Sequence, residues 1–426
     1  MLIKKLHTTL LNRIGIILIL FSTLQACTYL NLGHELKSAK KNLFFIKANI
    51  EASADKQTIA VLFKRSDKAN INYVGYRVVS PEQPIFFIVP EGNYHLVAFQ
   101  DDNNDYKYQQ GEKNGINSDI ELYQLPKGIA LASYISSIQP EAITLTETAL
   151  DKAYKINLSV STLQTGKALK KNNYLKVVNF SESRFSMENI KNGMWKPLTF
   201  LKEVGYGLYL LEEWNEHKLP LVLIHGINSS PRMWESFIND IDTDKYQIML
   251  YHYPSASSLS LSSYYLREAL VDISKRNKNK ISFVAHSMGG LVTRGAIQAL
   301  TPDVQKNIDL FFTMSTPWGG NAGAQFAVET APIVAPVWKD LTPESQYIKR
   351  IYQQALPNNV QHIMLVSYAG NAFMVSEKND GSVTLSSQLY YPAQEQADKT
   401  YLINADHTSI ITDKQTKKLA RKYLFK

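Results

Sequence analysis

The length, composition and charge of this chain exclude several classes of protein. With 426 residues, of which 45% are hydrophobic and 20% charged, it has enough apolar material for two or three globular domains. The net charge of +8 is spread along the chain, and no Lys/Arg block is interleaved with aromatic residues, which argues against nucleic-acid binding. A basic chain of this kind suits an anionic membrane surface instead.

The first 26 residues have the pattern of an export signal. Three basic residues precede an apolar run at residues 14–24, which is too short for a comfortable membrane span. The signal ends in LQAC, whose last residue, Cys27, is the only cysteine, so an intrachain disulfide is excluded. This tetrapeptide resembles a bacterial lipobox. The resemblance implies cleavage before Cys27, membrane anchoring through two or three acyl chains on it and, because Thr28 follows, sorting to the outer membrane of the bacterial cell envelope. A soluble secreted protein with an incidental cysteine is the alternative.

Beyond the lipobox the sequence predicts three regions and a linker. Residues 27–54 have apolar positions at three- and four-residue spacing and predict a helical tether. Residues 55–165 contain short β-branched or aromatic segments such as QTIAVLFKR between turn residues, which predicts an antiparallel β-sandwich-like domain. The Lys/Asn/Ser-rich stretch 166–204 predicts a linker. Strands then alternate with helices over residues 205–426, as in an α/β fold.

One loop of the sandwich region has the residue spacing of an oxygen-rich calcium loop. Asp101, Asn103, Asp105 and Glu112 stand at the first, third, fifth and twelfth positions of DDNNDYKYQQGE. Tyr106 stands where such a loop normally has glycine. The alternative is a solvated turn, because Asp and Asn form turns without any metal. A calcium ion held here would be structural.

The stretch ISFVAHSMGGLVTRGAI predicts a nucleophile elbow at Ser287. An apolar, strand-like run at residues 281–285 precedes this serine, and an amphipathic helix is predicted for residues 290–300. In such an elbow the strand and the helix nearly touch, so the neighbours two residues away must be small, as Ala285 and Gly289 are. Because a pattern this short also arises from composition alone, the assignment depends on finding partners for the serine.

A serine hydroxyl needs a base to take its proton, and two histidines follow the elbow. His362 begins an apolar run and so stands at the amino end of a strand. His407 follows the strand-like TYLINAD and opens a loop at the carboxyl end, the edge at which sites in parallel sheets gather. His407 is therefore the predicted base. We expect His225 to brace a loop through backbone hydrogen bonds and His286 to form a pocket wall.

The third member of such a site is a carboxylate that fixes the tautomer of the imidazole. It is expected between the serine and the base in the chain. Asp380 is favoured because it lies in an Asn-Asp-Gly turn after the strand-like IMLVSYAG. Glu377, Asp406 and Asp340 remain alternatives at this stage.

Five motifs, LVLIHG, VAHSMGG, STPWGG, NDGSV and ADHTS, occur in the order and spacing of α/β-hydrolase lipases. Over residues 205–426 the chain resembles bacterial lipases and the related GPI-inositol deacylase-like group. The resemblance implies an α/β-hydrolase fold, a mostly parallel sheet with helices on both faces, preceded here by the antiparallel domain. It also implies an oxyanion hole formed by the backbone N–H groups of Ile227 and Met288.

The expected function is that of a membrane-anchored serine hydrolase. It would cleave carboxylic esters as a lipase, an esterase or a phospholipase, with a lipid or ester as its partner and without a catalytic cofactor. An acyltransferase or lipid deacylase with the same three residues, and a non-catalytic envelope lipoprotein, remain open because this fold hosts many chemistries. The apolar stretch between Trp318 and Asp340 is either a lid or acyl-chain wall, or a cap helix packed on the sheet.

Overall fold

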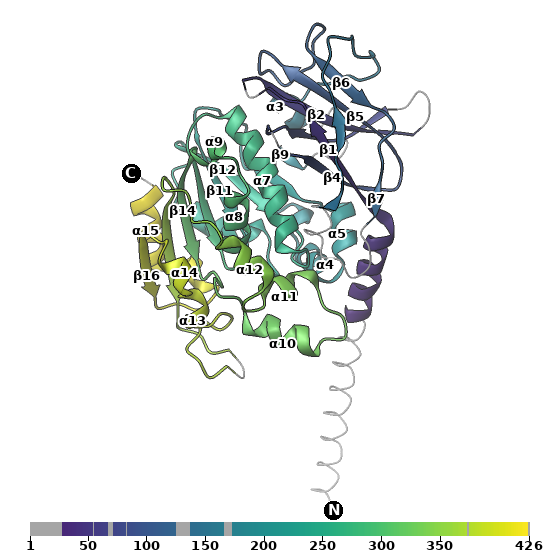
Figure 1. Ribbon diagram of the computed structural model, residues 1–426. Helices are drawn as coiled ribbons and strands as arrows, with labels where there is room; N and C mark the ends of the chain where they lie inside the picture. The colour runs from purple at the N-terminus through teal and green to yellow at the C-terminus, as the bar shows by residue number, and fades with distance from the viewer. Residues whose placement is uncertain are drawn as a thin grey trace, which may run out of the picture.

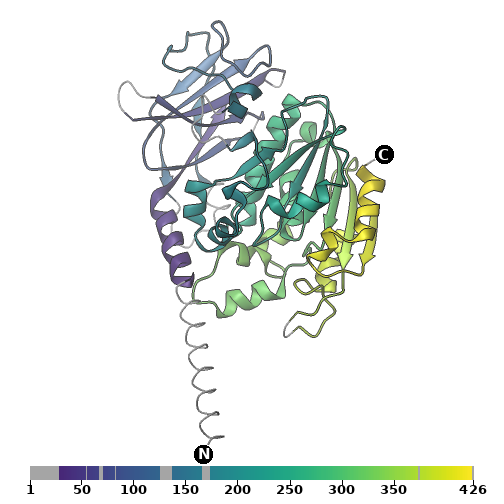
Figure 2. The same ribbon diagram turned by 180° about the vertical axis from the view of Figure 1, so that it is seen from behind.

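The molecule consists of an N-terminal β-sandwich packed beside a helix-covered central sheet (Figures 1 and 2). The computed structural model describes residues 28–53, 55–66, 71–81, 83–124, 137–165, 173–372 and 375–424. The predicted signal peptide at residues 1–26 and the predicted acylation site Cys27 lie outside these residues. Among the helices of the described part, none is both long enough and apolar enough to cross a membrane.

The N-terminal domain consists of two four-stranded sheets. Its strands are β1 (Leu43–Ile50), β2 (Gln57–Arg65), β3 (Ile71–Val78), β4 (Ile85–Pro90), β5 (Asn93–Asp101), β6 (Asn114–Asn117), β7 (Tyr123–Gln124) and β8 (Glu141–Ile143). One sheet has the order β4-β1-β7 with β8 also on β1, and the other has the order β3-β2-β5-β6. Every pairing is antiparallel except β1 with β8. Alternate residues of both sheets, such as Ile46 and Leu62, share one core, as in a sandwich.

The expected helical tether is shorter than predicted, and it is packed against the protein. Residues 28–42 are helical, whereas residues 43–50 form strand β1. The segment LFFIKANI is apolar at almost every position, so its spacing fits a helix and a buried strand equally well. Leu32 in this helix is fully buried, and Glu35 accepts hydrogen bonds from the N–H and Oγ1 of Thr199, both at 2.8 Å. The helix is therefore part of the folded body.

The central sheet has eight strands in the order β16-β15-β14-β13-β11-β12-β10-β9. They are β9 (Tyr174–Val177), β10 (Gly207–Leu210), β11 (Leu219–Ile224), β12 (Tyr246–His252), β13 (Ile281–His286), β14 (Ile308–Met314), β15 (Gln361–Ser367) and β16 (Lys399–Ile403). Only the β10–β12 pair is antiparallel. This mostly parallel sheet and the antiparallel domain before it confirm the predicted α/β architecture with an N-terminal antiparallel domain.

Much of the expected linker at residues 166–204 belongs to this hydrolase domain. Strand β9 pairs with β10 as the edge of the sheet. Helix α3 (Val160–Thr165) precedes it, and η1 (Ser183–Phe185), α4 (Met187–Trp195) and α5 (Pro197–Glu203) follow it. The segment was predicted as a linker because β9 has only four residues and is surrounded by polar ones. Its place in the sheet depends on pairing with a strand thirty residues away.

Helices cover both faces of the sheet (Figures 1 and 2). The remaining helices are η2 (Pro231–Trp234), α6 (Glu235–Ile238), α7 (Leu259–Arg276), α8 (Met288–Gln298), α9 (Pro302–Gln305), α10 (Ala322–Thr330), α11 (Pro336–Leu341), α12 (Gln346–Ile351), α13 (Leu385–Gln388), α14 (Tyr391–Gln394), η3 (Ser409–Ile411) and α15 (Lys414–Leu424). Side chains of α7, α8, α11 and α12 form one core with the sheet, and those of η2, α6 and α15 form the other.

Helix α7 joins the two domains. The first hydrophobic core continues from α7 into the sandwich strands β2, β3 and β5. Arg276 and Asp272 form a buried ion pair at 2.8 Å, and the Oη of Tyr76 on β3 donates to the same carboxylate at 2.9 Å. Arg276 also donates to the carbonyl oxygen of Leu158 and lies over the ring of Tyr106. The sandwich is therefore fused to the hydrolase domain through a polar cluster within a shared apolar core.

Candidate active site

Ser287 stands on a sharp turn between strand β13 and helix α8. Its φ of 54° and ψ of −130° lie in a region that residues other than glycine rarely adopt, as a nucleophile elbow requires. The following helix comes so close that a Cβ built on Gly289 would lie 2.6 Å from the carbonyl oxygen of Ile224. The small residues of the sequence motif are thus explained by the crossing of β11 and α8.

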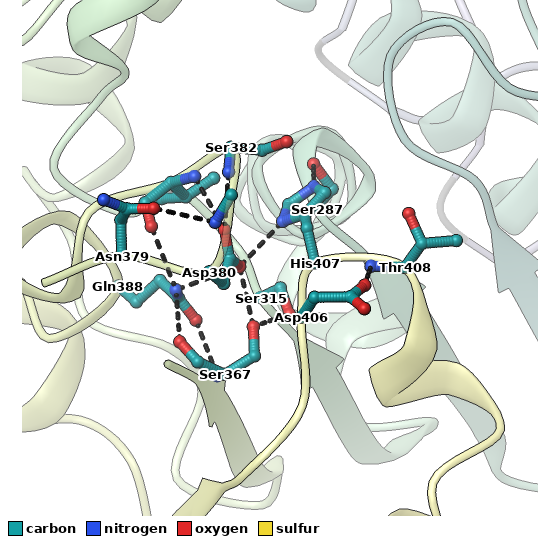
Figure 3. A network of polar contacts seen from close by, with 12 residues as sticks. Ser287, Ser315, Ser367, Asn379, Asp380, Ser382, Gln388, Asp406, His407 and Thr408 are labelled. Carbon is teal, nitrogen blue, oxygen red and sulfur yellow. Dashed lines mark hydrogen bonds and ion pairs between the residues drawn. The ribbon is translucent and has the colours of Figure 1, made fainter. Parts of the chain in front are cut away.

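The structure brings together the three side chains predicted from sequence (Figure 3). The Nε2 atom of His407 lies 2.9 Å from the Oγ of Ser287, and its Nδ1 atom lies 2.8 Å from the Oδ2 of Asp380. Ser287 follows β13, Asp380 lies in the loop after β15, and His407 lies in the loop after β16. The carboxyl ends of parallel strands meet at one edge of the sheet, which is why residues so distant in sequence converge.

The backbone around His407 is held from two sides. Its N–H donates to the carbonyl oxygen of Asp380 at 2.8 Å, and its own carbonyl oxygen accepts from the Nε2 of His286 at 2.7 Å. Burial, and next the nearby His407, lower the pKa of His286 to about 3, so this ring is neutral at ordinary pH. His286 is therefore a brace for the predicted base, whereas the sequence suggested a pocket wall.

Asp380 is a buried carboxylate surrounded by hydrogen-bond donors (Figure 3). Its Oδ1 accepts from the backbone N–H groups of Ser382 and Val383, and its Oδ2 accepts from the Oγ of Ser367 at 2.6 Å and the Nε2 of Gln388 at 3.1 Å. Burial acts to raise the pKa of Asp380. The hydrogen bonds and charge interaction with His407, and then the bond from Ser367, outweigh burial and lower it.

Ser367 and Gln388 were not predicted from the sequence. The side chain of Gln388 bonds both backbone groups of Ser367 as well as Asp380, and Ser367 Oγ lies 2.5 Å from the Oγ of Ser315. The one feature of the local sequence that pointed to Ser367 is that it ends an otherwise apolar strand at the edge where the site forms. Nothing local marks Gln388, since α13 must fold back over β15 before its amide reaches the carboxylate.

The alternative carboxylates have other partners. Asp406 accepts the N–H groups of Thr408 and Ser409, and Glu377 accepts that of Ser386. Asp340 accepts the N–H of Leu259 at the start of α7, and burial raises its pKa to about 6. Each of the three thus accepts a backbone N–H. Asp380 is the carboxylate that lies against the ring of His407.

Of the two predicted oxyanion donors, Met288 directly follows Ser287 in the chain, and Ile227 follows a glycine that lies against Ser287. Met288 is the first residue of α8, so its N–H has no acceptor within the helix. Ile227 follows Gly226, where an added Cβ would lie 2.8 Å from the Cβ of Ser287 and 3.3 Å from its Oγ. The N–H of Asn228 donates to Ser255 Oγ at 2.9 Å and holds this loop in place. The N–H of Met288 therefore lies beside Ser287 without a helical acceptor, as an oxyanion donor requires.

Two further histidines, His225 and His362, contact residues other than Ser287, Asp380 and His407. The Nδ1 of His225 lies 2.8 Å from the carbonyl oxygen of Gly226, as expected for a loop brace, and burial lowers the pKa of His225 to about 4. His362 is fully buried in β15, where its ring stacks on Phe311. The sequence argument that set His362 aside as the base agrees with this position.

The predicted calcium loop is folded around its own backbone. Asp101 accepts the N–H groups of Asp105 and Tyr106, and Glu112 accepts those of Asp102 and Gln109. Tyr106 has a φ of 63°, the conformation for which calcium loops normally use glycine. Within the described ranges, no three His, Cys, Asp or Glu side chains are grouped as metal ligands. The structural calcium ion in this loop therefore stays a prediction.

The contacts among Ser287, His407 and Asp380 at the edge of a mostly parallel sheet are the arrangement that serine hydrolases use, and part of the chain is similar to serine esterases. Residues 215–350 match the family described as "Putative serine esterase (DUF676)". That segment includes Ser287 and both oxyanion donors and ends before Asp380 and His407. The match covers less than half of the chain.

Three relatives illustrate the similarity. The chain is 26% identical over 163 residues to "Lysosomal thioesterase PPT2 homolog" of Drosophila melanogaster; the aligned part covers 32% of this chain and spans only 55% of that relative. The mature lipase BlEst2 of Bacillus licheniformis is 19% identical, with a TM-score of 0.41 over 50% of this chain and 94% of the lipase. Lipase B of Aspergillus fumigatus is 14% identical, with a TM-score of 0.40 over 59% of each chain.

Proposed function

We propose that this protein is a membrane-anchored serine hydrolase that cleaves carboxylic esters of lipids through an acyl-enzyme on Ser287. The observation that carries the proposal is the continuous hydrogen-bonded series from Ser287 through His407 to Asp380. A weak nucleophile, a base in contact with it and a carboxylate that orients the base are the parts that acyl transfer requires.

The reaction follows from these contacts. Ser287 Oγ attacks the ester carbonyl carbon while the Nε2 of His407 accepts the hydroxyl proton, and the N–H groups of Ile227 and Met288 stabilise the tetrahedral oxyanion. His407 then donates that proton to the departing alkoxide, which leaves as an alcohol. A water molecule repeats the sequence on the acyl-enzyme and releases the acid. The negative charge of Asp380 stabilises the imidazolium at both stages, so no cofactor takes part.

The lipid substrate and the membrane location rest on sequence features. The acylated Cys27 would anchor the chain, in the outer membrane of a bacterial envelope, and the apolar segment around α10 lies on the connection that follows β14. Thioester cleavage is a second candidate, favoured by the similarity to a protein named as a thioesterase. The same residues would serve it, with a thiolate as leaving group. An acyltransferase or lipid deacylase would differ only in its acceptor or substrate.

A fluorophosphonate probe tests the nucleophile directly. We expect covalent labelling of the wild-type protein and of Ser181→Ala, a control at an exposed serine, and no labelling of Ser287→Ala. Equal labelling of wild type and Ser287→Ala would refute the proposal, and so would an unlabelled wild type. Products from p-nitrophenyl esters of graded chain length, acyl thioesters and phospholipids then identify the bond cleaved. Acyl transfer to an added alcohol or amine in preference to water would indicate a transferase.

A further inference from the structure

Helix α10 and the beginning of the helix at residues 28–42 expose large apolar side chains. Of the nine residues of α10, only Ala324 is buried, and Phe326 is 66% exposed. Leu30 is 71% exposed. A helix that leaves an aromatic side chain in water lacks the partner that normally covers its apolar face. The exposed residues of α10, including Phe326, and Leu30 together form a surface that we call the α10 face.

The two parts of the α10 face are joined by direct contacts. A Cβ built on Gly33 would lie 3.1 Å from the Cδ1 of Ile333, in the segment between α10 and α11. The ring of Tyr29 packs edge-on against Trp338 of α11 and against Trp195 of α4. Figures 1 and 2 both show the start of this purple helix beside α10. Leu30 lies one turn before Gly33 on the same side of its helix, so it points toward the same region.

The α10 face is also linked to the active site. Asn321, which caps α10 through its side chain, donates from Nδ2 to the carbonyl oxygen of Ser382 at 2.8 Å. Ser382 in turn donates its N–H to the carboxylate of Asp380. The α10 face therefore stands at the edge of the sheet that carries the reacting groups.

We propose that the α10 face docks on a phospholipid bilayer. The occupant is indicated by the predicted acylation site: Cys27 stands directly before the helix that carries Leu30 of the α10 face. Acyl chains on Cys27 would enter the bilayer at this point, and Leu30 and Phe326 would enter beside them. The inference rests on the proposed membrane anchoring and extends it, because it states which face meets the lipid.

The packing of the first helix fixes the orientation of the molecule on the membrane. Leu32 is fully buried, and the carboxylate of Glu35 accepts two hydrogen bonds from Thr199 in the first turn of α5. An anchor followed by a free tether would let the active site point in any direction. Here no such tether separates the anchor from the folded body, so the edge with Ser287 faces the bilayer and takes its ester from it.

Site-specific fluorescence tests the docking in the full chain. Cys27 is the only native cysteine, and acylation blocks its thiol, so Phe326→Cys and Ile116→Cys each introduce one site for a thiol-reactive fluorophore. Ile116 is a matched control because it is 45% exposed and lies on β6, at the end of the molecule away from α10 (Figure 1). In phosphatidylglycerol/phosphatidylethanolamine vesicles, we expect nitroxide-labelled lipid to quench the fluorophore at position 326 and not the one at position 116.

Three outcomes would overturn the proposal. The first is equal quenching by lipid at the two positions. The second is shielding of position 326 without lipid quenching, which would indicate a second copy of the chain as occupant. The third is labelling of the wild type, which would show that the Cys27 thiol is free.

A kinetic comparison separates docking from catalysis. Phe326→Ser is expected to lower the hydrolysis of an ester embedded in vesicles about 10-fold, the effect of losing one buried aromatic side chain. Hydrolysis of dissolved p-nitrophenyl acetate should be unchanged, and Ile116→Ser should leave both rates unchanged. Equal loss on both substrates in Phe326→Ser would refute docking and leave the proposed hydrolase intact. If the wild type does not hydrolyse the dissolved ester, the proposed hydrolase activity itself is refuted.

Discussion

The active-site edge and the junction on α7 both bury a charged carboxylate, but they satisfy it differently. Asp380 accepts hydrogen bonds from two backbone N–H groups, a hydroxyl, an amide and the ring of His407. Asp272 depends on Arg276 and on the hydroxyl of Tyr76, and its Oδ1 has no partner within the described residues. In the first arrangement, the donors hold a charged carboxylate against the ring of His407. The second holds two domains together, and it depends on one cation.

The largest expected effect of a substitution at these two carboxylate sites is that of Asp380→Asn. The asparagine occupies the same space but no longer favours the tautomer of His407 that leaves Nε2 free to accept the serine proton. We expect kcat to fall by about 10⁴-fold while the melting temperature changes little. Steady-state hydrolysis of a dissolved ester measures the loss. Asp406→Asn, at the neighbouring carboxylate that only caps backbone, should retain wild-type activity, and similar losses in both variants would contradict the assignment.

At the junction we expect a loss of stability with catalysis preserved. Arg276→Ala leaves the carboxylate of Asp272 buried without its cation, which should lower the free energy of unfolding by about 3–5 kcal/mol. Both side chains of this pair are 4% exposed. The control is Lys306→Ala, which breaks the pair with Asp303 in which both side chains are 66% exposed and should cost less than about 1 kcal/mol. Denaturant titration measures both. Equal effects would show that burial of the junction pair has no energetic consequence.

The smallest expected effect is that of a substitution at a donor to Asp380 within the active site. Ser367→Ala removes one of several donors to Asp380, so kcat/KM should fall about 10-fold, the value of a hydrogen bond to a charged group. The bond from Ser367 helps to lower the pKa of Asp380. Without it the pKa of Asp380 rises, so the carboxylate loses its charge at a higher pH than in the wild type. The acidic limb of the kcat/KM profile should therefore move to higher pH.

Two readouts separate this positioning role from a purely structural one. Ser315→Ala, which removes only the next hydroxyl behind Ser367, should give a smaller shift of the acidic limb in the same direction. A loss of activity in Ser367→Ala with an unchanged pH profile would indicate that the serine only supports the fold. Ser367→Thr, which keeps a hydroxyl, should restore the wild-type profile if the hydrogen bond is what matters.

Where the sequence prediction was wrong, the error has a physical cause. Residues 43–50 were predicted as helix because an almost wholly apolar segment has no distinctive period, and they became strand β1 once β4 and β7 could pair with it. Strand β9 was placed in a linker because it is four residues long and polar in its surroundings. Both segments owe their structure to distant pairing partners.

The elbow serine, the base and the α/β alternation were determined by the sequence itself, because a strand, a tight turn with small neighbours and a helix are local patterns. The choice of Asp380 over Glu377, Asp406 and Asp340 was settled by tertiary structure. So were the support from Ser367, Gln388 and His286 and the packing of the first helix against α5 and α11. The reason is that a hydrogen bond between residues tens of positions apart leaves no mark on the sequence around either of them.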